Sequence, residues 1–113
     1  MCSKHELDII LQKIAEAYRV VYGDNLVKVM MYGSYARGDY DNYSDVDIAA
    51  IVRGERQELQ NALKKIWDTS SELELEYETI VSPTVIPFDE YEQYRNDVPY
   101  YRNIEKEGVV IVA

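Results

Sequence analysis

The chain has 113 residues, of which 47% are hydrophobic and 29% are charged, and its formal net charge at pH 7 is −9. This size and composition predict one globular domain over residues 1–113, and since there is neither a long apolar run nor a charged leader before an apolar segment, we expect a cytoplasmic protein without a membrane span. The negative charge disfavours binding along an extended nucleic-acid template, which relies on Lys and Arg.

The N-terminal segment has the pattern of an amphipathic helix. Ser3 and Glu6 have the spacing of a capping box, in which each residue satisfies a backbone N–H of the first turn. Apolar residues then recur at intervals of three and four, which places them on one face of a helix. We therefore expect a helix over residues 4–22 that ends at Gly23.

The next segment predicts two strands joined by a short turn and a loop. Residues 26–32 are rich in Val and Met, which indicates a buried strand. The strand at residues 46–52 is apolar apart from one aspartate, and a single charge in such a strand must be paired, bind a metal or have a function. Between the strands we expect a helical turn over residues 34–38, with Ser34 as its N-cap, and a polar loop over residues 39–44.

The second half of the chain predicts a helix, a strand and two short helices. Apolar spacing indicates a helix over residues 55–69, with Trp67 in the core. Alternating residues then predict a strand over 74–81, with Glu74, Glu76 and Glu78 on one face. Two prolines make residues 84–86 an edge strand or an irregular continuation. Short helices are expected over 88–95 and 99–107, and residues 109–112 are expected to form a terminal strand or a docking strip.

Three strands and several helices in this order indicate an α/β or α+β fold with a small mixed β-sheet flanked by helices. Asp45 and Asp47 are the candidate chemical residues, because positions i and i+2 of a strand face the same side, about 6.5 Å apart. Two such carboxylates can hold Mg²⁺ together with phosphate oxygens. Gly33 permits close backbone approach, and Ser34 can contribute donors to a phosphate.

These residues carry a resemblance to a known family. Gly33-Ser34, ten intervening residues and Asp45-Val46-Asp47 resemble the signature of the DNA polymerase β-type nucleotidyltransferases. The string Gly-Ser-Tyr-Ala-Arg-Gly before Ser-Asp-Val-Asp resembles their smallest branch, the minimal nucleotidyltransferase domains. The likeness extends to residues 80–83 and 101–108, so that it covers nearly the whole chain.

The resemblance implies transfer of a nucleoside monophosphate from a triphosphate, with ATP as the expected substrate and two Mg²⁺ ions, or Mn²⁺, as cofactors. Asp45 and Asp47 would hold the metal, and Gly33 and Ser34 would receive the triphosphate. Arg37 would contact a β- or γ-phosphate, or alternatively form an ion pair with Asp39 or Asp41.

A third carboxylate is also implied, on a later strand beside the metal. Glu78 fits this place best and Glu76 is the alternative, although all three glutamates of the expected strand could instead line a solvated sheet face. The family position often holds Asp, so that Glu here changes the expected metal geometry.

The resemblance also implies an acceptor. Minimal domains of this kind pair with HEPN-type toxins and, as antitoxins, transfer AMP to a toxin tyrosine, which is the leading expectation for this chain. One alternative is a homodimeric subunit that modifies a small molecule such as an antibiotic. Another is a module that neutralises a toxin by contact alone.

Overall fold

A computed structural model describes residues 3–112 of the chain. Its centre is a four-stranded mixed sheet in the order β3-β2-β1-β4. β1 pairs antiparallel with both β2 and β4, whereas β2 and β3 are parallel. The elements are α1 (Lys4–Tyr22), a 3-10 turn η1 (Gly23–Asn25), β1 (Leu26–Tyr32), α2 (Ser34–Arg37), β2 (Val46–Val52), α3 (Arg56–Tyr77), β3 (Val81–Pro87), α4 (Phe88–Tyr94), α5 (Pro99–Glu107) and β4 (Val109–Val112).

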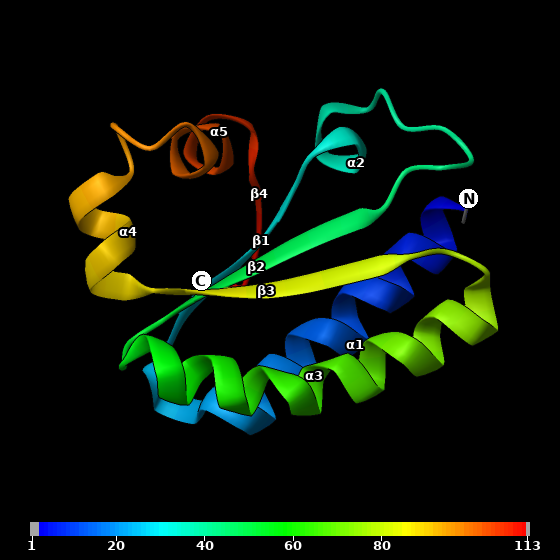
Figure 1. Ribbon diagram of the computed structural model, residues 1–113. Coiled ribbons are helices and arrows are strands. Elements are labelled where there is room, and N and C mark those ends of the chain that lie inside the picture. The colour runs from blue at the N-terminus through cyan, green and yellow to red at the C-terminus, as the bar shows by residue number, and fades with distance from the viewer. Residues whose placement is uncertain (1–2, 113) are drawn as a thin grey trace.

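The two faces of the sheet are covered by different helices. α1 and α3 run beneath the sheet in Figure 1, while α2, α4 and α5 lie on its other side. Residues 46, 48, 50 and 52 of β2 belong to the larger core with α1 and α3. Ala49 and Ile51 pack in the smaller core with Tyr91 of α4 and Ile104 of α5. Because strand residues alternate, Asp47 lies on this second face.

Most of the expected elements are confirmed, including the helix over residues 4–22 and the strands over 26–32 and 46–52. The capping box is formed, because Glu6 N donates to Ser3 Oγ at 3.1 Å and Ser3 N donates to Glu6 Oε1 at 2.9 Å. The α/β fold with a small mixed sheet is also confirmed. Residues 109–112 form a strand at one edge of the sheet, as one of the two alternatives predicted.

The strand expected over residues 74–81 is wrong. α3 continues to Tyr77, because its buried positions keep helical spacing through Leu73 and no Gly or Pro interrupts it. Leu75, which a strand would have placed on the face opposite the three glutamates, is 85% exposed. Glu74 instead accepts a hydrogen bond from Val81 N at 2.8 Å and so ties the helix to the start of β3.

β3 begins at Val81 and includes Pro83 and Pro87. It lies at an edge of the sheet, where a missing N–H donor is tolerated. Trp67 is 45% exposed, so that its expected place in the core is also wrong. Within residues 3–112, no helix combines the length and the apolar character needed to cross a bilayer.

Candidate functional site

The bend after β1 lies against the acidic side chain of β2. Gly33 has φ 76°, and a Cβ at this position would overlap Asp47 Oδ2 and lie 3.3 Å from Asp47 Cγ. Glycine is therefore required at position 33 for two reasons. The residue has a left-handed backbone conformation, and the Asp47 carboxylate occupies the space that a side chain would fill. The predicted proximity of the bend and the second acid is present in the fold.

Asp45 and Asp47 are half-buried and interact with each other. Burial raises the pKa of Asp47 above its usual value, the charge of Asp45 raises it further, and Arg37 lowers it. Asp45 comes immediately before β2, so that it stands at the mouth of the strand that carries Asp47. The structure thus brings together two carboxylates whose negative charges repel each other. A bound cation would offset this repulsion.

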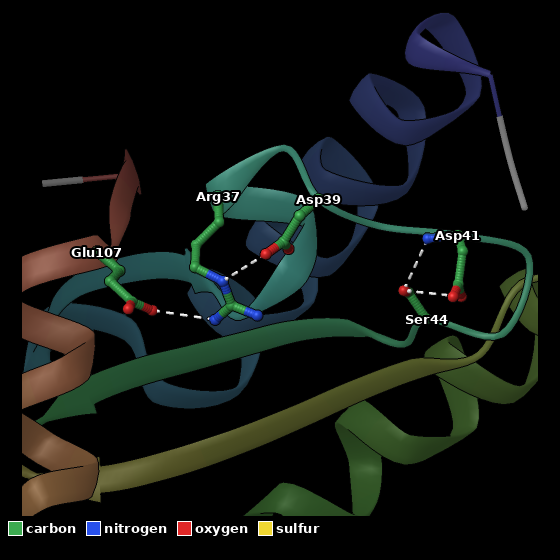
Figure 2. Close-up of polar contacts among 5 residues, drawn as sticks. All are labelled: Arg37, Asp39, Asp41, Ser44 and Glu107. Carbon is green, nitrogen blue, oxygen red and sulfur yellow. Dashed lines mark hydrogen bonds and ion pairs between the residues drawn. The ribbon is translucent and has the colours of Figure 1, made fainter.

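The loop before Asp45 is shaped by Asp41. Tyr43 N donates to Asp41 Oδ1 at 2.9 Å, and Asp41 N donates to Ser44 Oγ at 3.0 Å. Figure 2 shows the Asp41 and Ser44 side chains facing each other across this turn, with Ser44 Oγ 3.3 Å from Asp41 Oδ1. The hydrogen bonds of Asp41 therefore stabilise the conformation of the loop itself.

Arg37 links this region to the C-terminal helix. Its Nε donates to Asp39 Oδ2 at 3.2 Å and its Nη1 donates to Glu107 Oε2 at 3.1 Å (Figure 2). Of the two ion pairs considered from the sequence, the one with Asp39 is present. The pair with Glu107 could not be seen in the sequence, because the two residues are 70 positions apart.

Ser34 is the first residue of α2, and Gly33 takes the N-cap position expected for Ser34. The Ser34 carbonyl accepts from Gly38 N at 2.9 Å and from Asp39 N at 3.2 Å, which closes the turn. Ser34 is half-buried beside the bend that touches Asp47. Its role in receiving a triphosphate stays a prediction.

Glu78 lies at the C-cap of α3, in a left-handed conformation with φ 52°, rather than in a strand. Glu76 is an exposed residue of the same helix. Among residues 3–112, no group of three or more His, Cys, Asp or Glu side chains is arranged to hold a metal ion. The structure therefore brings Asp45 and Asp47 together but does not group either glutamate with them.

β3, the strand beside Asp47, carries hydroxyl side chains rather than a third carboxylate. Asp47 is in register with Ser82 of β3, and Ser82 shares its face of that strand with Thr84. Thr84 Oγ1 donates to Ile48 O at 3.2 Å. The neighbour of the acid pair on this side is therefore neutral and polar.

Tyr32 is a site neighbour that the sequence analysis missed. It is paired across the antiparallel strands with Asp47, and its hydroxyl lies 2.7 Å from that of Tyr100. Burial and this hydrogen bond raise the pKa of Tyr32 well above its usual value. The antiparallel register of the two predicted strands could have indicated Tyr32, but not Tyr100.

Comparisons with known proteins show the family of the chain. Residues 7–112 match the family described as nucleotidyltransferase domain. The chain is 33% identical over 100 residues to "Putative protein adenylyltransferase MJ0141" of Methanocaldococcus jannaschii, which covers 82% of this chain and 99% of that protein. It is 26% identical to "Putative protein adenylyltransferase MJ0604" of the same organism, over 89% of this chain and 93% of that protein.

Solved structures share the fold at low sequence identity. A crystal structure of a toxin-antitoxin with AMP-PNP has a TM-score of 0.53 and 16% identity, covering 88% of this chain and 70% of that one. The structure named "Crystal structure of a putative nucleotidyltransferase from Sulfolobus solfataricus" has a TM-score of 0.51 and 21% identity, covering 96% of this chain and 86% of that one.

Proposed function

Because this chain belongs to the nucleotidyltransferase domain family, we propose that it transfers AMP from ATP to a tyrosine hydroxyl of a partner protein. The observation that carries the proposal is the contact between the Gly33 bend and the Asp47 carboxylate. A polyphosphate received at that bend lies directly beside the acid pair.

The donor set fits divalent metal ions. Asp45 and Asp47 supply oxygen ligands, and burial together with their mutual repulsion makes a bound cation favourable. Mg²⁺, with Mn²⁺ as an alternative, would neutralise the phosphate charge and align the attacking and leaving oxygens when bound. Two carboxylates leave further ligand places for phosphate oxygens and water, which suits Mg²⁺.

The remaining residues position the nucleotide. Gly33 allows the triphosphate to approach the backbone, and Ser34 donates its hydroxyl to a phosphate oxygen. Arg37 directs its guanidinium to a β- or γ-phosphate, for which its planar fork is suited. The acceptor oxygen then attacks the α-phosphorus, the bond to pyrophosphate breaks, and the hydroxyl proton passes to water.

The proposed acceptor is a tyrosine of a HEPN-type toxin, for which this chain would be the antitoxin. Two kinds of similarity support this choice. The relatives in Methanocaldococcus jannaschii carry the name "Putative protein adenylyltransferase", and the structural neighbours include toxin-antitoxin crystal structures, one of them with AMP-PNP.

The proposal is tested by incubating the chain with labelled ATP, Mg²⁺ and the product of the adjacent gene. We expect label on a tyrosine of the partner and loss of label with Asp45→Asn combined with Asp47→Asn. Label on a small molecule of a cell extract, with none on the partner, would contradict the proposed acceptor. Protection of cells by the doubly substituted chain would show that binding alone neutralises the toxin and would overturn the enzymatic proposal.

A further inference from the structure

The hydroxyls of Tyr32 and Tyr100 lie on the face of the sheet that carries Asp47. Tyr32 is directly opposite Asp47 across β1 and β2, and such cross-strand neighbours have Cβ atoms about 4.5–5.5 Å apart. The Tyr32 hydroxyl is 2.7 Å from the Tyr100 hydroxyl, and their rings meet edge to face with centroids 5.7 Å apart. The first turn of α5 therefore places the Tyr100 hydroxyl against that of Tyr32, the cross-strand neighbour of Asp47.

Tyr100 differs from the other tyrosines in this region in its accessibility. Tyr32 is half-buried in its strand, and the hydroxyls of Tyr91 and Tyr101 donate to Glu105 and Glu90. Tyr100 is 42% exposed, and its hydroxyl bonds to that of Tyr32. Tyr100 is thus an exposed tyrosine that contacts the cross-strand neighbour of Asp47.

We propose that the chain adenylylates its own Tyr100 in cis when ATP is bound, because Tyr100 is exposed and its hydroxyl contacts that of Tyr32, the cross-strand neighbour of Asp47. This inference rests on the proposed function. The Tyr100 oxygen attacks the α-phosphorus of ATP and forms a phosphodiester bond with AMP. The bond between the α-phosphorus and the bridging oxygen breaks, pyrophosphate leaves, and the phenol proton passes to water.

Self-transfer would have a consequence for the partner reaction. An AMP group on Tyr100 would sit over the face that carries Asp47 and would occupy the acceptor side of the site. The modified chain should therefore transfer AMP to its partner more slowly than the unmodified chain. Tyr100 would act as an internal competitor of the external tyrosine.

The test uses the full chain with ATP and Mg²⁺ in the absence of partner, followed by intact-mass measurement and peptide mapping. We expect a mass increase of one AMP group, located on Tyr100, with a rate per chain that does not depend on protein concentration. Tyr100→Phe should lose this label. Tyr94→Phe is the matched control, because Tyr94 is 40% exposed but belongs to α4, and it should keep the label.

The outcomes separate this inference from the proposed function. Label on Tyr43, which is 92% exposed, in place of Tyr100 would show that exposure decides the acceptor and would overturn the inference. A rate that rises with protein concentration would exclude transfer in cis. Label on the partner but never on this chain would overturn the self-transfer alone, whereas no label on either protein would overturn both. Mapping of the unsubstituted chain keeps the test independent of whether Tyr100→Phe folds.

Discussion

Asp47 is the one charged residue of β2, whose other six residues are buried. Its pKa is raised, first by burial and then by Asp45, so that the ionised carboxylate weakens the fold at any pH above its folded pKa. That cost disappears as the pH falls below the pKa of the unfolded chain, because the group is then protonated in both states. The charge is thus kept at the expense of stability, as expected of a residue with a chemical role.

Asp47→Asn should therefore raise the melting temperature at neutral pH without divalent metal, and the gain should vanish at acidic pH. The same change should lower AMP transfer at least about 100-fold, which is about 2.7 kcal/mol of barrier. Thermal melting across pH and a transfer assay measure the two effects. Asp68→Asn, at an exposed position of α3, is the control and should change neither. A less stable Asp47→Asn protein would contradict the argument.

Arg37 is shared between two carboxylates and, in the proposed function, a phosphate. Because Glu107 accepts from its Nη1, Glu107→Gln should free the guanidinium for the nucleotide and lower the KM for ATP about two- to fivefold. Steady-state kinetics measure this, with Glu92→Gln as a control that removes one exposed carboxylate elsewhere. A higher KM would mean instead that Glu107 orients Arg37 toward the phosphate.

At the scale of elements, a helix or strand is predicted correctly when the residues that determine its bounds lie within its own segment of the sequence. α1 was predictable because its caps and its periodic face lie within one segment. The end of α3 was not, because residues 73–77 satisfy both a helical and an alternating pattern. The hydrogen bond from Val81 N to the Glu74 side chain favours the helical pattern over the alternating one. This bond follows from the fold and not from the local sequence.

The contacts of the candidate site likewise fall into those that the local sequence predicted and those that depend on the fold. The spacing of Gly33 and Asp47 predicted their proximity, because two neighbouring strands and a turn connect them. Tyr100 and Glu107 reach the site from α5, 68 and 70 residues after their partners in the chain. No local pattern could have indicated them, since their position depends on how α5 packs on the sheet.

The left-handed end of α3 gives a prediction for that helix. Glu78 has φ 52°, a conformation that costs a residue with a side chain about 1–2 kcal/mol and glycine much less. Glu78→Gly should raise the free energy of unfolding by about 0.5–1 kcal/mol. Denaturant unfolding measures this, and Glu76→Gly, in the helix itself, should lower stability by a similar amount.

AMP transfer by the same variant tests the role that the sequence suggested for Glu78. Its position at a helix end, apart from any group of metal-holding side chains in residues 3–112, predicts that transfer by Glu78→Gly is unchanged. A loss of transfer with a stable fold would restore Glu78 as the third carboxylate.

At the scale of the whole molecule, the net charge of −9 is spread over a body of 35 × 27 × 20 Å. Self-repulsion acts across such a body at about 0.01 M salt, where the Debye length is about 30 Å, and much less at about 0.15 M, where it is about 8 Å. The melting temperature should therefore rise between these salt concentrations at pH 7. Near the sequence pI of about 4.5 the rise should disappear, and a fall at pH 7 would contradict the argument.

The Gly33 bend and Asp47 belong to one hairpin, formed by β1, α2 and β2. Contacts between residues close in the chain lose little loop entropy on closing and tend to form early. During synthesis, the Gly33 bend can therefore meet Asp47 before α5 has left the ribosome. Tyr100 and Glu107 can join Tyr32 and Arg37 only after α5 has emerged.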